Sequence, residues 1–570
     1  MKEVISEILM KSLKKQGISV KKEEIEKFIE IPPSYDMGDY AFPCFFLAER
    51  MKTPPDEIAL KIRGEIRGKD IPMEFGDIQT SGAYVNFFLD RKMIALKLIR
   101  EIKSLKDKYG KPSSETPAKR TMVEFPSPNT NKPLHVGHLR NMTIGESVSR
   151  MSEFAGEKVI RANLNNDRGI HICKSMAAYD KYGENKIPPK KEKSDHFVGD
   201  FYVMFNEKSK TDLQMERESH RILQQWEAGD KKTLALWKKM NKWALDGFKE
   251  TYKKFGISHD VEFFESEIYK KGKEIVEKGL KDEIFYKKKD GAIAVDLKKE
   301  GLGEKILIRL DGTSVYITQD LYLAELKYKR YKINKSIYVV GNEQNYHFNV
   351  LFSILKKLGF HFQGLKHLSY GMVNLPEGKM KSREGTIVDA DDLIKEVQKL
   401  VKRELRSRDN LPEKQMEERS LKIALAAIKY LLLRVDTKKD MIFNPKESID
   451  FEGDTGPYIL YSYARASSIL GKVKPGTKKY SAGELENQEV SLVKKISEFK
   501  DVVQKSFNEL NPSILANYSY QLAKIFNEFY HACPVIGSEK ESFRIDLVIS
   551  FRQILKTSLY LLGIEPLEKM

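Results

Sequence analysis

The spacing of hydrophobic positions changes along the chain and divides it into three regions. The first, residues 1–112, begins with a helical pattern and ends in residues 82–89, whose alternating bulky side chains suit a half-buried strand. A helix is predicted from Arg91, and the Gly-, Pro- and Ser-rich stretch 109–116 is typical of a linker. We therefore expect an independent α+β domain at the start of the chain.

Apolar strands and helices alternate in the second region, residues 117–405. This alternation is typical of a doubly wound α/β domain with a parallel sheet. A charged stretch opens a predicted helical insertion at about 185–290, in which Trp226, Trp237 and Trp243 are expected to be core residues. The α/β pattern is expected to resume around residues 292–295.

Helical periodicity dominates the third region, residues 412–570. Residues 423–433 are apolar nearly all round, so this helix must be buried. The turn-rich segment 451–458 precedes a helix that carries Tyr461 and Arg465. The third region is therefore predicted to be an all-α domain, and the chain as a whole an α/β multidomain protein.

Composition and charge agree with several folded domains and suggest an anionic partner. A chain of 570 residues exceeds one core and is expected to form about three or four domains. Lys and Arg outnumber Asp and Glu by 99 to 82, a net charge of +17. A field of this sign attracts a polyanion such as RNA, although a lysine-rich proteome would give the same excess.

The cysteines and the first residues indicate a cytoplasmic protein. Cys44, Cys173 and Cys533 are odd in number and far apart, which provides neither a disulfide framework nor a CxxC-type metal site. We expect no metal ligands and no tightly bound cofactor. The N-terminus is charged and lacks a signal core, and no apolar stretch reaches membrane-spanning length, so no membrane contact is expected.

The run from Val123 to Arg140 reads as a strand, a tight polar loop and a helix start. Asn131 and the proline two residues later are a plausible N-cap and first helical turn. His135 and His138 lie three apart on one helix face, and the glycine between them lets a flat ligand approach the backbone. Because a helix N-terminus attracts phosphate, this run predicts a nucleotide site. Taken alone, the two histidines would equally suit an ordinary packed helix face.

The segment His135-Val136-Gly137-His138 resembles the HIGH signature of class I aminoacyl-tRNA synthetases, and the longer run resembles its arginyl-tRNA synthetase version. The resemblance implies that ATP binds at His135, Gly137 and His138. It also implies a Rossmann-like catalytic domain over 117–405 and a helical anticodon-binding domain over 412–570. The N-terminal additional domain of that family touches the tRNA elbow, whereas the plainer alternative here is a packing domain.

A second segment, from Gly378 to Thr386, places cations between glycines and resembles the KMSKS loop of the same family. In-line attack on the α-phosphate builds up charge that positioned cations stabilise, and Lys379 is the first candidate, with Arg383 beside it. Without the resemblance, such a loop is usually solvated surface. Met372 and Val373 would offer backbone groups to adenine by the resemblance, or be buried strand residues.

This second segment departs from the general class I pattern. Lys381 and Ser382 stand where serine and lysine are expected, and the fourth-position lysine is absent. Many arginyl-tRNA synthetases also lack that lysine and carry one just before the HIGH motif, where Lys132 stands here. We therefore predict that Lys132, together with His135, His138 and Lys379, carries the catalytic phosphate contacts.

The residues 316–320, Tyr-Ile-Thr-Gln-Asp, resemble the YxTxD segment of the family, and their i,i+4 spacing puts Tyr316 and Asp320 on one helix face. A planar guanidinium is best matched by carboxylates and other acceptors, so these two residues with Glu124 form a predicted arginine pocket. By the resemblance, Asn129 and Gln344 hold the α-amino end. The alternative for each is ordinary surface polarity, and the turn 166–169 is expected to lie behind the pocket.

Together, these resemblances predict an arginine–tRNA ligase that uses ATP with Mg²⁺ as its substrate complex. Arginine would be activated to arginyl-adenylate and passed to the terminal 2'-OH of tRNA(Arg). The resemblance implies a monomer, with tRNA contacts from Tyr458 and Arg465. Two alternatives stay open: a class I synthetase or nucleotidyl transferase with another substrate, and a tRNA-binding paralogue without chemistry, which the altered Lys381 and Ser382 would motivate.

Overall fold

The computed structural model describes residues 1–34, 37–66, 68, 71–112, 119–212, 214–360, 364–374, 388–408, 411–473 and 481–570. The chain divides into two compact units. The first comprises residues 1–109, 472–497 and 525–553, and the second comprises residues 110–471, 498–524 and 554–570. Within the described ranges, none of the helices combines the length and the apolar character that crossing a bilayer requires.

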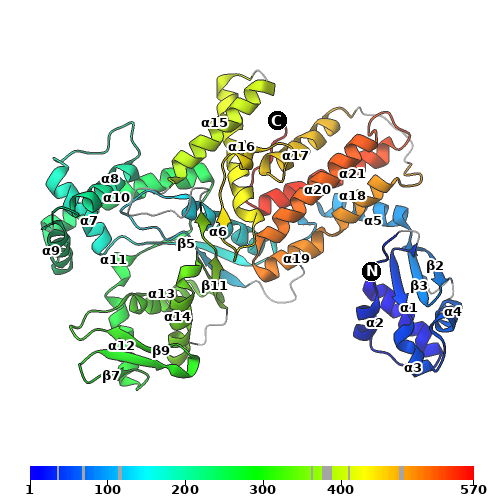
Figure 1. The fold of residues 1–570 in the computed structure, drawn as a ribbon, viewed down its shortest axis with the longest axis horizontal. Coiled ribbons are helices and arrows are strands. Elements are labelled where there is room, and N and C mark those ends of the chain that lie inside the picture. The colour runs from blue at the N-terminus through cyan, green and yellow to red at the C-terminus, as the bar shows by residue number, and fades with distance from the viewer. Residues whose placement is uncertain are drawn as a thin grey trace. The chain divides into compact units, whose positions relative to one another are not determined.

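An α+β module opens the first unit, as predicted (Figure 1). Its antiparallel sheet has the order β1-β3-β2 and is covered by helices, with the elements α1 (Lys2–Lys15), α2 (Lys22–Phe28), β1 (Tyr40–Pro43), η2 (Phe45–Leu47), α3 (Ala48–Met51), α4 (Pro55–Glu65), β2 (Phe75–Ser81), β3 (Tyr84–Leu89), α5 (Arg91–Leu105) and η4 (Lys106–Lys108). Asp90 caps α5 by accepting a hydrogen bond from Met93 N. The strand and the helix expected around residues 82–105 are therefore confirmed.

The first unit also contains helical segments from the end of the chain. These are α18 (Asn487–Ser497), the last part of α20 (Pro512–Ala532) and most of α21 (Glu541–Leu561). Arg544 on α21 donates to Glu489 on α18 at 2.7 Å, and both side chains are almost fully buried. This ion pair joins the two helices inside the unit.

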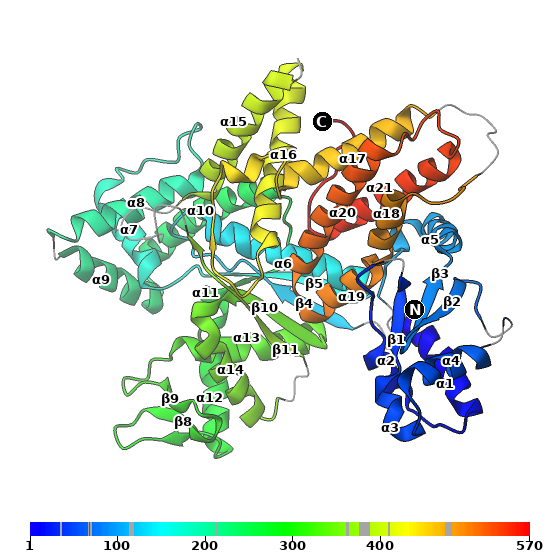
Figure 2. The same cartoon turned by 45° about the vertical axis from the view of Figure 1, so that its right-hand side comes forward.

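A five-stranded parallel sheet forms the centre of the second unit (Figures 1 and 2). Its order is β11-β10-β4-β5-β6, with β4 (Arg120–Glu124), β5 (Lys158–Asn165), β6 (Val261–Phe264), β10 (Lys335–Gly341) and β11 (Leu365–Tyr370). Helix α6 (Val136–Phe154) packs against β4, β5 and β10. The strand order reverses between β4 and β10, so the carboxyl ends of these two strands form the switch point where such sheets bind ligands.

The helical insertion lies between β5 and β6, so it begins earlier and ends earlier than the predicted range of about 185–290. It consists of α7 (Ile170–Tyr182), α8 (Ser194–Lys208), α9 (Gln214–Ala228) and α10 (Lys231–Phe255). The prediction extended too far because β6 belongs to the main sheet, where Val261 pairs with Ala162 of β5. The tryptophans pack in this helical group as expected.

Residues 292–295 do not resume the main sheet, contrary to the prediction. They fall at β8 of a separate antiparallel sheet, β7-β8-β9, with β7 (Tyr286–Lys287), β8 (Ile293–Leu297), η5 (Lys298–Glu300) and β9 (Gly303–Ile308). Around it lie α11 (Glu265–Ile268), α12 (Lys271–Lys281), α13 (Tyr316–Tyr331), η6 (Asn342–Gln344) and α14 (Asn345–Lys357). Its apolar alternation suits either sheet type, so the sequence pattern did not distinguish them.

Helices complete the second unit. They are α15 (Ala390–Arg408), α16 (Glu413–Arg434), η7 (Glu447–Ile449), α17 (Gly456–Gly471) and α19 (Phe499–Glu509), with β12 (Val373–Asn374) and β13 (Met441–Ile442) paired in parallel. The apolar stretch of α16 is buried along nearly its whole length, as predicted. This burial places α16 inside the unit that holds the parallel sheet.

Candidate active site

The helix that follows β4 begins at a later residue than the sequence predicted. Asn131 and Pro133 lie in the loop, and α6 begins after His135, which is its N-cap residue. His135 Nδ1 accepts a hydrogen bond from Gly137 N at 3.1 Å, and His138 Nδ1 accepts one from His135 N at 3.1 Å. Two imidazoles therefore satisfy N–H groups at the helix start, the role expected of Asn131.

Both imidazoles are neutral hydrogen-bond donors. Because Nδ1 of each ring accepts a hydrogen bond, the proton of the neutral ring sits on Nε2. Burial, with the nearby Lys132 ammonium, lowers the pKa of His135 to about 3. Burial, with His135 and Lys132 nearby, lowers the pKa of His138 well below its usual value. The ring centroids are 3.9 Å apart, so two N–H donors lie close together where the helix dipole favours an anion.

Lys132 adds a positive charge to this helix start. Burial lowers the pKa of its ammonium, and no carboxylate pairs with it in the part of the chain that the structure describes. A partly buried ammonium without a counterion gains more from an approaching anion than one already in an ion pair. The position suits the predicted phosphate contact.

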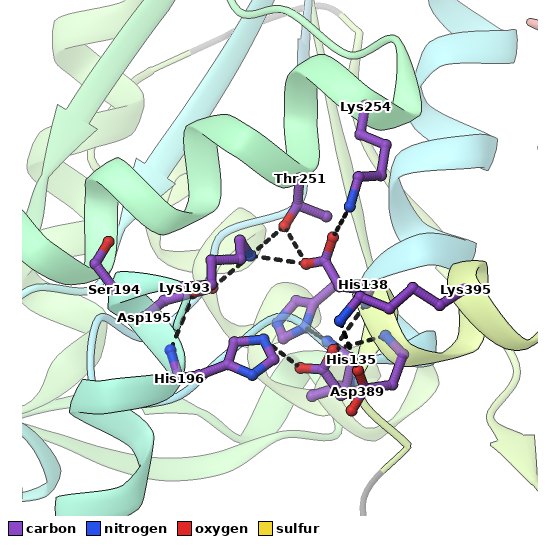
Figure 3. A network of polar contacts seen from close by, with 12 residues as sticks. His135, His138, Lys193, Ser194, Asp195, His196, Thr251, Lys254, Asp389 and Lys395 are labelled. Carbon is purple, nitrogen blue, oxygen red and sulfur yellow. Dashed lines mark hydrogen bonds and ion pairs between the residues drawn. The ribbon is translucent and has the colours of Figure 1, made fainter. Parts of the chain in front are cut away.

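A short backbone segment lies against the same helix start (Figure 3). Val136 N donates to Val388 O at 3.1 Å, and Ala390 N donates to Leu134 O at 2.9 Å. Between these two bonds, Asp389 forms an antiparallel bridge with the N-cap residue of α6. The loop before α6 is therefore held by residues more than 250 positions later in the sequence.

Lys379 and Arg383 fall within residues 375–387, which lie outside the described residues, so their predicted roles stay predictions. The positions that flank this range are described. Asn374 ends β12, and Val388 contacts the start of α6.

Arg140 on α6 donates hydrogen bonds to backbone carbonyls next to β12 and β13. Its side chain is fully buried, and it donates to Gly371 O at 2.7 Å, to Met372 O at 3.2 Å and to Lys439 O at 2.9 Å. Burial lowers the pKa of Arg140 to about 10, so the guanidinium stays charged at neutral pH. Backbone carbonyls, rather than a carboxylate, satisfy this charge.

The two residues predicted to contact adenine, Met372 and Val373, lie at the start of β12 and differ in their backbone hydrogen bonds. Met372 N already donates to Asp440 Oδ1 at 2.7 Å, and Met372 O accepts from Met441 N at 2.9 Å. The next residue, Val373, points its backbone groups to the opposite edge, because successive residues of a strand alternate in this way. Val373 therefore keeps backbone groups that do not face β13, and its side chain is buried, whereas the side chain of Met372 is exposed. Contact with adenine stays a prediction for both residues.

A cavity of about 470 Å³ lies beside the carboxyl ends of β4 and β10. All five residues predicted to bind arginine line it: Glu124, Asn129, Tyr316, Asp320 and Gln344. Tyr316 begins α13, and Asp320 lies one turn later on the same helix, as the spacing predicted. The structure therefore brings together residues that are up to 220 positions apart in the sequence.

Both predicted acidic ligands in this cavity already contact a basic side chain. Glu124 Oε2 lies 2.6 Å from Nζ of the fully buried Lys327, and Asp320 Oδ2 lies 2.7 Å from Nε2 of His347. Burial alone would lower the pKa of His347, but the hydrogen bond and charge of Asp320 outweigh it and raise the pKa. The carboxylates are therefore partly compensated within the chain.

The other residues that line the cavity include Arg168, Glu265 and His347, none of which was predicted to bind arginine. Arg168, expected behind the pocket, lines it. Burial raises the pKa of Glu265 to about 7, although Arg168 Nη1 at 3.8 Å and Gln319 Nε2 at 3.2 Å favour its charged form. Glu265 follows β6 directly, so it would have been suggested once β6 was recognised as a strand of the main sheet.

The two predicted tRNA contacts lie on α17. The ring centroid of Tyr458 is 5.5 Å from that of Tyr520, and the guanidinium carbon of Arg465 is 4.7 Å from the ring centroid of Tyr461. These contacts occur within the second unit and involve no RNA. Contact with tRNA stays a prediction for both residues.

Three family models match successive stretches of the chain. The Arginyl tRNA synthetase N terminal domain matches residues 2–89, the catalytic domain of tRNA synthetases class I (R) matches residues 99–445, and the DALR anticodon binding domain matches residues 459–570. The catalytic match includes α6, the cavity, and β12 with its partner strand.

Whole proteins give the same result. Arginine–tRNA ligase of Treponema denticola is 46% identical over 560 residues, covering 95% of this chain and 94% of the relative, and that of Borrelia hermsii is 41% identical, covering 100% and 99%. Thermus thermophilus arginyl-tRNA synthetase has a TM-score of 0.78 at 25% identity over 100% of both chains. The Plasmodium falciparum arginyl-tRNA synthetase, at 23% identity and a TM-score of 0.76 over 99% and 98%, has the same fold. The chain belongs to the arginyl-tRNA synthetase family of class I aminoacyl-tRNA synthetases.

Proposed function

We propose that the chain ligates arginine to tRNA in two steps at the site described above. The arginine carboxylate first attacks the α-phosphate of ATP, which gives arginyl-adenylate and releases pyrophosphate. The 2'-OH of the terminal adenosine of tRNA(Arg) then attacks the arginyl carbonyl carbon, and AMP leaves. The observation that carries this proposal is the single cavity that contains all five predicted arginine ligands, next to the loop that leads into α6.

ATP, brought with Mg²⁺ as part of the substrate, binds at the start of α6 in this proposal. The Nε2–H groups of His135 and His138 and the ammonium of Lys132 donate to phosphate oxygens, and Gly137 leaves room for the nucleotide. Val373 offers its backbone to adenine. Donors fixed in advance stabilise the charge that builds up on the α-phosphate, so no side-chain nucleophile is needed.

Arginine occupies the neighbouring cavity. Asp320 and Glu124 accept hydrogen bonds from the guanidinium, with the Tyr316 hydroxyl as a further acceptor, and Asn129 and Gln344 hold the α-amino group. A guanidinium presents a planar set of donors that such acceptors match. An uncharged amino acid leaves these acidic groups without that partner, which is the basis of selectivity.

The remaining expectations concern tRNA and the cellular setting. The net charge of +17 suits a polyanionic partner, with Tyr458 and Arg465 as contacts from α17. A reducing cytoplasm agrees with the three free, buried cysteines. We propose a monomer, on family resemblance.

Charging total tRNA with each amino acid in turn tests the function. Arginine alone is expected to be incorporated, and the Asp320→Ala variant is expected to lose this activity. Incorporation of a different amino acid would establish the alternative synthetase, whereas no incorporation by a folded protein would support the paralogue without chemistry. Arginine charging that survives in Asp320→Ala would contradict the assigned pocket.

A further inference from the structure

The carboxylate of Asp391 contacts side chains at the start of α8 and near the end of α10, two helices of the insertion. Asp391 lies in the first turn of α15 and is buried. Its oxygens lie 2.7 Å from Lys193 Nζ, 2.7 Å from Thr251 Oγ1 and 2.8 Å from Lys254 Nζ. Lys193 immediately precedes α8, and the other two residues lie near the end of α10.

The charges of this cluster balance within the protein. Lys193 also lies 2.9 Å from Asp195, whose side chain is fully buried, so two ammonium groups face two carboxylates. Burial alone would raise the pKa of Asp391, but Lys193 and Lys254 outweigh it and hold the pKa far below its usual range. Removal of one partner from such a buried set leaves an uncompensated charge, so the geometry of the set is tightly specified.

The cluster continues to the N-cap residue of α6 through Asp389. Asp389 Oδ1 accepts from Asp391 N at 2.8 Å and from Asp392 N at 3.0 Å, which caps α15. Its Oδ2 lies 3.2 Å from Nε2 of His196 on α8, and its backbone bridges His135. A continuous set of contacts therefore connects the insertion with the histidine that begins the ATP-site helix.

A cation site is the other use that these groups suggest, because His196, Asp389 and Asp391 each offer a ligand atom within 4.8 Å of the others. Both oxygens of Asp391 already face an ammonium, Oδ2 that of Lys193 and Oδ1 that of Lys254. A divalent cation would have to displace these charges. The contacts therefore fit a fixed link between the insertion and residues 388–390 better than a metal site. We call this link, centred on Asp391, the joint.

We propose that the helical insertion positions the ATP-site histidines, with Asp391 as the joint. Asp391 touches neither imidazole, so it is a positioning residue that acts through residues 388–390. The proposal rests on the proposed function, which places ATP at His135 and His138. Small displacements of groups that hold a reacting substrate lower the rate strongly, so loss of the joint is expected to weaken ATP use selectively.

The Asp391→Asn variant tests the joint, because it keeps the shape of the side chain and removes its charge. ATP–pyrophosphate exchange in the presence of tRNA is expected to show an increase of about tenfold in KM for ATP, with less than about a twofold change in KM for arginine. The Cε1–H NMR signals of His135 and His138 are expected to shift. Asp246→Asn on α10 is the control, since its carboxylate pairs with Lys242 at an exposed position, and it should change neither constant.

Lys254→Gln provides a second variant in case Asp391→Asn does not fold. It leaves Lys193 in place and is expected to change KM for ATP in the same direction by a smaller factor. Equal effects on both Michaelis constants, or a lowered melting temperature without histidine shifts, would overturn the positioning role. If the unaltered protein catalyses no arginine-dependent exchange, the proposed function fails instead, and the histidine NMR signals still report on the joint.

Discussion

The two parts of the proposed site, the ATP side at the start of α6 and the arginine side in the cavity, differ in how their charged groups are paired. On the ATP side, Lys132 has no carboxylate partner in the described part of the chain, and the two histidines are neutral donors. On the arginine side, Glu124 contacts Lys327 and Asp320 contacts His347. The first side has unused donors, whereas the second has acceptors that are already engaged.

The pairing on the arginine side follows from the cost of burying charge. An unpaired carboxylate in a buried cavity would be strongly destabilising, so the protein pairs it until the ligand arrives. If arginine binds here as proposed, it must share or replace a cation of the protein, and a neutral amino acid would gain nothing from doing so. ATP bound as proposed would meet no such competitor among the described residues, and its phosphates would supply counterions to the start of α6. Selectivity is therefore expected mainly on the arginine side.

Asp320→Asn should produce the largest change, because it removes a charged acceptor from the arginine side while keeping its shape. KM for arginine is expected to rise about a hundredfold, and KM for ATP should stay within about twofold. ATP–pyrophosphate exchange measures both. Glu325→Gln on the same helix, where the carboxylate pairs with Lys329 instead, should leave both constants unchanged. A normal KM for arginine in Asp320→Asn would show that Asp320 does not bind the substrate, and the proposed difference between the two sides would not hold.

Lys132→Ala should produce the next largest change, by removing the unpaired cation from the ATP side. The rate of adenylate formation is expected to fall about thirtyfold, because the charge that develops on phosphate loses a fixed partner. Arginine affinity, measured by calorimetry, should change little. Lys132→Arg should recover part of the rate. An unchanged rate in Lys132→Ala would refute the assignment.

A change of pH should affect the arginine side by a smaller factor. Asp320 raises the pKa of His347. Four further titratable groups interact with this pair: Glu265, Lys327, Tyr338 and His367. Below its raised pKa, the His347 imidazolium competes with the substrate guanidinium for Asp320. KM for arginine is therefore expected to fall about three- to fivefold as pH rises from below 6.5 through that pKa. His347→Gln should flatten this dependence, and an identical profile in that variant would exclude the competition.

The same change of pH should leave the ATP side unaffected. Burial holds the pKa of His135 at about 3 and that of His138 far below its usual value, so neither titrates between about pH 5 and 8. Histidine Cε1–H chemical shifts across this range are expected to stay constant for both residues. A titration step near pH 6 in either signal would show that the ring is charged in the resting enzyme.

Local sequence patterns predicted the features that depend only on the spacing of side chains within one helix. The apolar stretch of α16 had to be buried because no face of it is polar. Tyr316 and Asp320 had to share a face once a helix began at residue 316. In both cases the spacing of side chains along one helix determines the outcome.

Other features depend on partners that are distant in the sequence. The four residues of β6 become a strand of the main sheet only because β5 lies beside them, and an isolated segment this short has little preference. His135 replaced Asn131 as the N-cap because two imidazoles and residues 388–390 meet there. Lys193 and Asp391 are 198 positions apart, and neither stands in a recognisable motif. No periodicity along the chain encodes such a contact.

The carbonyl groups around Arg140 also determine when this enzyme can first hold its nucleotide during synthesis. Gly371 follows Arg140 by 231 residues, and Lys439 follows it by 299. At ribosomal speeds, the growing polypeptide needs about 15–60 seconds to cover the longer interval, and until then the guanidinium lacks the carbonyl of Lys439 as a partner. A nascent chain stalled before residue 439 should therefore emerge from the ribosome exit tunnel with β4 and α6 made but with β12 still lacking its partner strand β13.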